Sequence, residues 1–206
     1  MRYMINQRQD LLRFKVELTG ILPLIWREIL VPARYSFWDL HVAIQDVMGW
    51  QDYHLHQFRV LSGERGELVL VGIPNSEGFE DAREVLPGWE VAVVKYLSEP
   101  GDRVEYEYDF GDSWIHEITL VGVEPMVKRR RYPQCIGGER ACPPEDCGGV
   151  PGYASLVEAL LDPEHTEYDA VNEWLPAGWG PELFKPEQVR FDNPARRWRF
   201  AFADER

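Results

Sequence analysis

Two alternating stretches flank a tight turn between Arg103 and Val121, and this pattern constrains the fold more than any other feature of the chain. Arg103 to Tyr108 and Trp114 to Val121 both alternate in the way of strands that bury one face. Asp109-Phe110-Gly111-Asp112 has the composition of a hairpin turn. The sequence therefore predicts an antiparallel hairpin whose two strands each have an apolar face, formed by Val104, Tyr106, Tyr108 and Phe110 on the first and by Trp114, His116, Ile118 and Leu120 on the second.

The N-terminal part predicts a second antiparallel pair followed by a helix. Arg13 to Thr19 alternates strictly, and Trp26 to Val31 follows it as a second strand that ends at a proline. Ser36 and Asp39 form a capping box before an apolar stripe of helical spacing, and Gly49 stands where that helix is expected to end. Two further segments are strand-like, namely Leu55 to Leu61 and Glu67 to Ile73.

The rest of the chain contains segments predicted to be irregular and segments predicted to be helical. Pro74 to Gly88 is interpreted as a long loop, Glu90 to Leu97 is ambiguous between helix and strand, and the tail from Phe184 to Phe200 is short helix or loop. Two helices are predicted, Tyr153 to Leu161 and Thr166 to Leu175, the second with a capping box of Thr166 and Asp169. Strands followed by helices without regular alternation predict an α+β fold: a mostly antiparallel sheet with an inserted N-terminal helix and a helical C-terminal part. We expect one domain over residues 1–206, strand-rich over 11–124, rich in Cys, Pro and Gly over 133–152 and helical over 153–200.

Charge and composition narrow the class of partner. The net charge of −13 repels phosphate groups and argues against nucleic acid. One basic run, Lys128-Arg129-Arg130-Arg131, opposes the trend; it is interpreted as a solvated loop, with a local phosphate-binding patch as the alternative. No segment approaches the roughly 18 apolar residues of a membrane span, and the first ten residues lack the apolar core of a signal peptide. The odd number of cysteines, three, argues against a secreted disulfide framework and predicts a cytoplasmic location.

The cysteines suggest a structural metal site. Cys135, Cys142 and Cys147 are spaced C-x6-C-x4-C among glycines and prolines, which let a short backbone wrap an ion. With one distant histidine, His116, they would complete a tetrahedral zinc site of three thiolates and one imidazole. The alternatives are three small buried residues in a compact loop or a reactive thiol.

A second candidate site combines histidines and carboxylates. His54 and His56 stand two apart, so they share a strand face if the strand begins early, and such a pair ligates a metal when a third partner is present; an edge position beside aromatic residues is the alternative. Asp109 and Asp112 either cap the hairpin turn or form a polar site with His116, beside Trp114. Carboxylates and an imidazole together bind a divalent ion or relay a proton.

Several separate motifs carry a resemblance to one family. The chain resembles the plasmid pRiA4b ORF-3-like family over roughly residues 11 to 200, in which Lys185 stands where members often carry Asp. The resemblance implies a family without an established activity, some of whose relatives are labelled passenger proteins of insertion elements. The motifs that carry it are Leu24–Arg27, Trp38–His41, Met48–Trp50 with His54–Phe58, Tyr106–His116, Cys142–Gly149 with Gly152-Tyr153, and Phe184–Pro186.

Three functions follow, and none rests on a complete catalytic motif. The Asp-Phe-Gly triplet lacks the glycine-rich loop, strand lysine and His-Arg-Asp loop of kinases. The leading hypothesis is a non-enzymatic interaction or accessory protein that binds a protein or peptide. The second is a metal-dependent enzyme that uses the three histidines named above with Asp109 or Asp112. The third is a nucleic-acid-associated protein of mobile elements that binds through the basic run.

Overall fold

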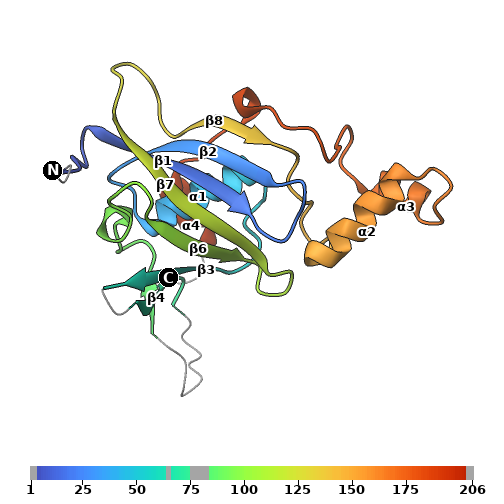
Figure 1. Cartoon of the computed structure of the whole chain (residues 1–206), viewed down its shortest axis with the longest axis horizontal. Coiled ribbons are helices and arrows are strands. Elements are labelled where there is room, and N and C mark those ends of the chain that lie inside the picture. The colour runs from blue at the N-terminus through green and yellow to red at the C-terminus, as the bar shows by residue number, and fades with distance from the viewer. Residues whose placement is uncertain (1–3, 64–65, 75–83, 203–206) are drawn as a thin grey trace.

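A single eight-stranded sheet organises the molecule, which is described by a computed structural model over residues 4–63, 66–74 and 84–202. The strand order is β5-β4-β3-β6-β7-β1-β2-β8, and every neighbouring pair is antiparallel except β4 and β5 (Figure 1). The fold is α+β, as predicted. The strands are β1 Asp10–Leu18, β2 Ile25–Pro32, β3 His56–Ser62, β4 Glu67–Gly72, β5 Val85–Pro87, β6 Arg103–Tyr108, β7 Trp114–Pro125 and β8 Gln134–Glu139.

Helix α1, Phe37–Met48, follows the β1–β2 pair and has the ends that its sequence predicts. The Ser36 hydroxyl accepts a hydrogen bond from the Asp39 amide at 3.2 Å, and the Asp39 carboxylate accepts one from the Ser36 amide at 3.0 Å. The helix ends at Gly49, whose φ of 86° lies in the left-handed region that favours glycine. The capping box and the C-terminal glycine are therefore both confirmed.

The inner face of the sheet forms the core. Helices α1 and α4 lie behind the sheet in Figure 1, on this face. Tyr106, Tyr108 and Trp114 point into it and are buried, together with His116. Phe110, predicted to share the inner face, is half exposed, because left-handed residues at Asp109 and Ser113 turn the chain before it can continue the strand. The aromatic face of the hairpin is thus internal and is not available to a partner.

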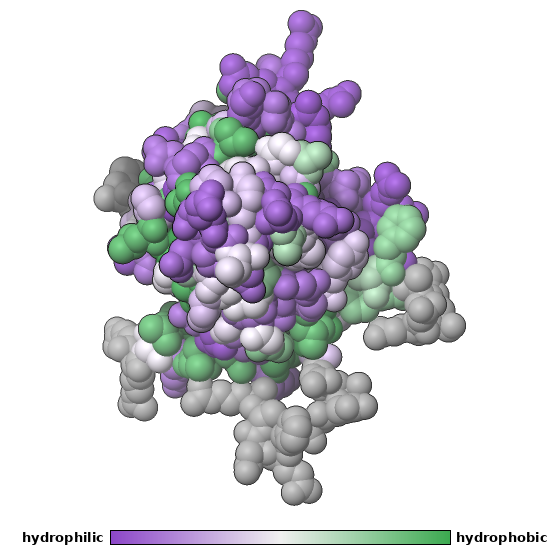
Figure 2. Space-filling view, turned by 90° about the vertical axis from the view of Figure 1, so that its right-hand side faces the viewer, coloured by the Kyte–Doolittle hydropathy of each residue, from purple (hydrophilic) through white to green (hydrophobic). Residues whose placement is uncertain are grey.

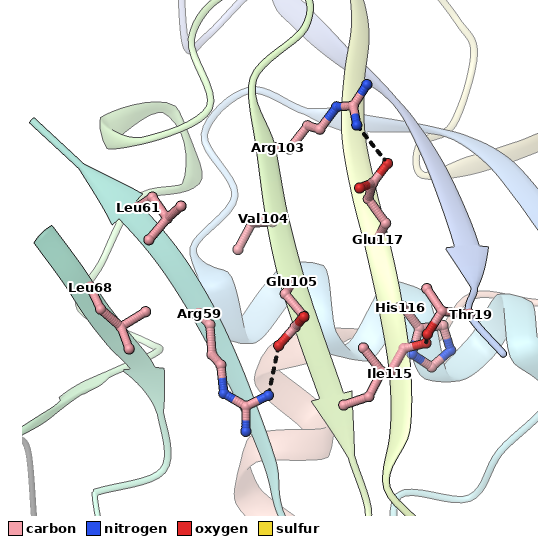
Figure 3. A pocket seen from close by; sticks show the side chains of 10 residues that line it. All are labelled: Thr19, Arg59, Leu61, Leu68, Arg103, Val104, Glu105, Ile115, His116 and Glu117. Atoms are coloured by element: carbon pink, nitrogen blue, oxygen red, sulfur yellow. Dashed lines mark hydrogen bonds and ion pairs between the residues drawn. The ribbon is translucent and has the colours of Figure 1, made fainter. Parts of the chain in front are cut away.

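No helix in the described part of the chain covers the opposite face of the sheet, which carries paired charged side chains. Figure 3 shows Arg59 directed to Glu105 and Arg103 to Glu117, at 2.7 and 3.1 Å. A shallow hollow of about 460 Å³ lies among them and includes the apolar side chains of Leu61, Leu68 and Ile115. An antiparallel sheet commonly leaves one face solvated in this way.

The segment rich in cysteine, proline and glycine contains a strand that the sequence did not predict. β8 pairs with β2 at the sheet edge, with Cys135 opposite Ile29. The strand was not predicted because it contains glycines in place of the side chains that usually signal a strand. Packing requires glycine at position 138, where a Cβ would overlap the Phe184 ring. β5 likewise lies inside the predicted loop from Pro74 to Gly88, of which residues 75–83 lie outside the described residues.

The C-terminal helices differ from their predictions mainly at the N-terminal ends. Helix α2, Gly149–Leu161, begins four residues early, because Pro151 is tolerated in a first turn. Helix α3, Tyr168–Trp174, starts after Glu167 without a side-chain cap, so the predicted capping box of Thr166 and Asp169 is wrong. A 3₁₀ turn, Val93–Lys95, occupies the ambiguous segment, and the tail holds a second 3₁₀ turn, Pro186–Gln188, and helix α4, Pro194–Ala201.

The C-terminal elements differ in how closely they join the sheet. α4 packs its Trp198 ring against Trp38 of α1, with ring centroids 5.4 Å apart. α2 and α3 extend beyond the sheet, and Figure 2 shows that this side of the molecule is mostly hydrophilic, with hydrophobic residues in small patches. No helix in the described ranges is long and apolar enough to cross a bilayer.

Candidate functional site

Three segments that lie far apart in the sequence meet at one end of the sheet. They are residues 50–55 after α1, the β6–β7 turn at 109–113, and residues 142–149 before α2. We call the surface that they form the hairpin end. It contains parts of three motifs on which the family resemblance rests, so those motifs describe one place in the structure.

The phenol of Tyr108 joins two of these segments to the hairpin. Its hydroxyl donates to Glu145 Oε1 at 2.6 Å and accepts from the Tyr53 amide at 3.0 Å. Burial raises the pKa of Tyr108, and the hydrogen bond to Glu145 raises it further, so the hydroxyl keeps the proton that it donates. Glu145 also accepts from the Gln51 amide, and the Trp50 indole donates to the Pro143 carbonyl at 2.9 Å.

The two aspartates of the turn have separate structural roles. Asp109 Oδ1 accepts from the Gly111 amide at 2.9 Å, which is the turn-capping role predicted for it. Asp112 instead reaches the start of α2, where its Oδ2 accepts from the Gly148 amide at 3.2 Å. A Cβ at Gly149 would lie 2.6 Å from the Asp112 carbonyl oxygen, so glycine allows the turn and α2 to approach each other.

The hairpin end carries an excess of carboxylates. His54 Nε2 lies 3.0 Å from Asp146 Oδ1 and 3.6 Å from Asp109 Oδ2, and ligand atoms of these three residues all lie within 4.8 Å of one another. Across the described part of the chain, no Lys or Arg nitrogen pairs within 4.0 Å with Asp109, Asp112, Glu145 or Asp146. Two of these carboxylates, Asp109 and Asp146, face His54, and with Asp112 and Glu145 on the same segments the local charge is negative.

Exposed apolar side chains accompany these acids. Tyr53, Leu55 and Phe110 are 67%, 51% and 50% exposed. The Asp109 amide donates to the Leu55 carbonyl at 3.0 Å, which places Leu55 beside the turn that carries Phe110. Exposed aromatic side chains are among the residue types enriched where proteins bind one another, and such surfaces have a polar rim.

A second group of ionisable residues lies inside the molecule. The rings of His41 and His56 stack with centroids 3.5 Å apart and an interplanar angle of 8°. His41 Nδ1 lies 2.8 Å from the Tyr106 hydroxyl and its Nε2 lies 2.8 Å from Asp52 Oδ1. Gln45 Nε2 donates to the Tyr106 hydroxyl at 3.0 Å, so Gln45, Tyr106, His41 and Asp52 form one hydrogen-bonded chain.

Ligand atoms of His41, Asp52 and His56 also lie within 4.8 Å of one another. Stacked parallel rings direct their lone pairs side by side and not toward a common point, so the arrangement suits a hydrogen-bonded network better than a metal centre. Burial and the neighbouring His41 hold the pKa of His56 well below its usual value, and His56 Nδ1 has no hydrogen-bond partner among the described atoms. His56 therefore stays neutral in the folded protein.

His54 and His56, which were predicted to act as a pair, lie in different places in the structure. β3 begins at His56, so the condition for a shared strand face is not met: His56 is internal, whereas His54 lies at the hairpin end. Sequence reasoning missed His41 and Asp52 as members of a group. The available signal was the helical stripe, because His41 follows Phe37 by four residues and so lies on the buried face of α1.

The predicted zinc ligands are not gathered at ligand distance. Within the described ranges, two groups of three or more candidate ligands have their atoms within 4.8 Å of one another, and neither includes Cys135, Cys142, Cys147 or His116. Burial raises the pKa of all three thiols, that of Cys147 to about 12, and so disfavours the reactive thiolate. The zinc site therefore stays a prediction.

His116 is completely buried on β7. Its Nδ1 lies 3.1 Å from the Trp114 carbonyl, while its Nε2 has no partner in the described structure. Burial lowers the pKa of His116 to about 4, and the nearby charge of Arg27 lowers it slightly further. Trp114 is buried in the same cluster, and both residues lie inside the fold and not on the hairpin end.

The basic run lies in the loop between β7 and β8. Lys128 to Arg131 are exposed, and this loop forms the hydrophilic projection at the top of Figure 2. Exposure agrees with its interpretation as a solvated loop.

Comparisons with known proteins identify the family. A family model described as "Plasmid pRiA4b ORF-3-like protein" matches residues 10–189. An "Uncharacterized protein y4hQ" of Sinorhizobium fredii is 34% identical over 169 residues, which cover 80% of each chain. The protein of unknown function MM3350 from Methanosarcina mazei Go1, known from a crystal structure, is 38% identical in sequence. Its structure superposes on this one with a TM-score of 0.80, and the match covers 89% of this chain and 99% of that chain. Because the match spans most of the chain and includes the hairpin end, the chain belongs to the plasmid pRiA4b ORF-3-like family.

Proposed function

We propose that this protein is a non-catalytic binding protein and that the hairpin end takes up a protein partner with basic side chains. The observation that carries the proposal is the set of four carboxylates opposed by one histidine, next to exposed Tyr53, Leu55 and Phe110. Basic side chains of a partner would supply the missing counter-charges, and the apolar groups would supply buried area.

The open face of the sheet is a weaker candidate for the same role. Its charges already pair with one another, as Arg59 does with Glu105 and Arg103 with Glu117. A partner would have to replace these contacts before gaining any of its own. At the hairpin end a partner would have to replace only the contact between His54 and the exposed Asp146 carboxylate, because Asp109, Asp112 and Glu145 can keep their hydrogen bonds within the fold.

The geometry also favours binding over catalysis. Gln45, Tyr106, His41 and Asp52 form a chain that resembles an acid–base relay, but Tyr106 and His41 have no exposed surface and His56 has 3%. A general acid or base must come within hydrogen-bond reach of its substrate. The relay therefore supports the fold by satisfying buried polar groups.

The test compares the proteins captured from a cell extract by the wild-type chain and by surface variants. A Phe110→Ser, Asp146→Asn double variant removes one apolar and one acidic group of the hairpin end. Leu61→Ser, on the open sheet face and 71% exposed, is the matched control. We expect a partner that is retained by the control, lost with the double variant and released by salt. A capture profile that the double variant leaves unchanged would refute the proposal.

A metal-dependent function is the second candidate, because His54, the buried Asp109 and the exposed Asp146 bring one imidazole and two carboxylates close together. Such ligands suit Zn²⁺ or Mn²⁺. Elemental analysis and calorimetric titration with each ion test it. Stoichiometric binding that is lost with Asp146→Asn supports this site. Binding that survives Asp146→Asn and is lost with Cys147→Ser supports the cysteine site instead, and no binding removes both.

Nucleic-acid binding through the basic run, Lys128 to Arg131, stays a prediction from the sequence. Titration with labelled DNA and RNA at two salt concentrations tests it, since phosphate contacts weaken steeply with salt. Absence of binding at low salt would exclude the role.

A further inference from the structure

Arg27 of β2 is a buried cation without an acidic partner. Its side chain belongs to a residue that is 1% exposed. Nε donates to the Val47 carbonyl at 2.9 Å, and Nη1 donates to the carbonyls of Trp26 at 2.8 Å and Glu139 at 2.9 Å. All three acceptors are neutral, and among the described residues no carboxylate lies within 4.0 Å of the guanidinium.

A buried charge without a counter-charge is unusual, because removing an ion from water is costly unless it is paired. Burial lowers the pKa of Arg27, yet a guanidinium remains protonated in proteins. Three of its five N–H groups are used by the carbonyls. The Nη2 amino group makes no hydrogen bond to any described residue and is the part left for a ligand.

Arg27 lines a hollow of about 550 Å³ that is basic, in contrast to the chain as a whole. Lys185 and Arg190 add two positive charges to its lining. Asp46 is the acidic residue of the lining, and its carboxylate is already engaged by the Arg197 guanidinium at 2.7 Å and the Asp192 amide at 2.8 Å. The unbalanced charge of the hollow is therefore positive.

Aromatic residues hold the guanidinium in place and give the hollow an apolar wall. The Phe184 ring lies over Arg27, 3.6 Å from Cζ, and fits there because position 138 is glycine. The Trp179 indole, which also lines the hollow, is fixed by donating to the Cys142 carbonyl at 3.3 Å. A ligand would thus meet a cation with a set direction and a rigid aromatic surface.

We propose that this hollow binds a small organic oxyanion, a carboxylate or a phosphate ester, whose charged oxygens pair with Arg27 Nη2 and Lys185 and whose apolar part lies against Trp179. The hollow lies next to the hairpin end, with which it shares Cys142, but none of the four carboxylates of the hairpin end lines it, so the site is an addition to the proposed protein-binding function. A volume of about 550 Å³ is within the range that accommodates a metabolite-sized molecule.

Calorimetric titration with three probes of similar shape tests the proposal: phenyl phosphate, phenylacetate and neutral 2-phenylethanol. We expect at least one of the anions to bind and the alcohol not to bind, and the stronger anion shows which oxyanion is preferred. Lys185→Gln should weaken the bound anion about tenfold, as loss of one charge-assisted hydrogen bond does. Lys95→Gln, at the exposed end of the 3₁₀ turn Val93–Lys95 and outside the hollow, is the matched control and should leave the affinity unchanged.

Arg27→Met should abolish binding in a protein that keeps the wild-type circular dichroism spectrum. If that variant does not fold, Lys185→Gln and Trp179→Leu test the proposal, and each should weaken anion binding. Both residues lie at the wall of the hollow and not under the sheet. The proposal is overturned if neither anion binds at millimolar concentration, if the alcohol binds as well as the anions, or if Lys95→Gln weakens binding as much as Lys185→Gln.

Discussion

Replacing His116 by methionine is expected to remove a defined part of the acid sensitivity of this protein. His116 is completely buried among Tyr106, Trp50 and Trp114, and burial lowers the pKa of its imidazole to about 4. Methionine has a similar volume, adapts to irregular cavities and carries no titratable proton. The substitution also removes Nε2, which has no hydrogen-bond partner in the described structure.

The magnitude follows from the two pKa values. In the unfolded chain the imidazole binds a proton as the pH falls below about 6.5, whereas in the folded chain it does so only below about 4. Between these values the unfolded state holds more protons, so the free energy of unfolding decreases as the pH falls, by up to about 1.4 kcal/mol per pH unit. The stability is fully present above pH 6.5, and about 2 kcal/mol of it is lost by pH 5.

The assay is urea unfolding followed by tryptophan fluorescence at pH 8, 7, 6 and 5. His56, whose pKa is also lowered by burial, contributes acid sensitivity of the same sign, so the quantity to compare is the difference between wild type and variant. That difference should change by about 2 kcal/mol between pH 8 and pH 5 in favour of His116→Met. Leu120→Met, a buried substitution on the same face of β7, is the control and should keep the wild-type pH dependence. A His116→Met protein with the wild-type pH dependence would refute the reasoning.

Three further substitutions test local features by thermal or urea unfolding. Ser36→Ala should lose about 1 kcal/mol of stability with its cap, whereas Thr166→Ala, which caps nothing in the structure, should be nearly neutral; equal losses would contradict the assignment of the caps. Gly152→Ala should destabilise by about 1–3 kcal/mol, because a Cβ there would overlap a carbonyl oxygen of the preceding loop, and a neutral result would show that the loop moves freely. Tyr108→Phe removes the donor to Glu145 and should cost about 1–3 kcal/mol and increase proteolysis of the loop before α2; unchanged proteolysis would show that the hydroxyl does not hold that loop.

Local patterns in the sequence were sufficient for the framework of the fold. Alternation predicted β1, β2, β3, β4, β6 and β7, and the capping box and glycine predicted both ends of α1. These signals are reliable because each depends on residues within one strand or one helical turn. The prediction failed where the local signal was absent, as in β8, whose glycines are required by packing against Trp26 and Phe184.

The candidate site was predictable only in part. The sequence predicted a polar group of Asp109, Asp112 and His116 at the hairpin and a separate pair of His54 and His56. The structure places both aspartates and His54 at the hairpin end with distinct partners, whereas His116 and His56 are buried inside the fold. The sequence could not pair His54 with Asp146, which lies 92 residues away. Nor could it predict that the aromatic face of the hairpin is internal, because alternation shows that two faces differ without showing which one a helix covers.

By itself the sequence determined the α+β class, the positions of six strands, both ends of the first helix, and membership in the family. Only the tertiary structure decided that Tyr108 binds Glu145 across 37 residues, that His41 stacks on His56, and that Arg27 is buried without a carboxylate. The physical reason is that periodicity and capping act over a few residues, whereas a charge or a hydrogen bond depends on whatever the sheet register and loop paths bring within a few ångströms. The features most relevant to binding, the acidic hairpin end and the basic hollow beside Arg27, both arise from such long-range contacts.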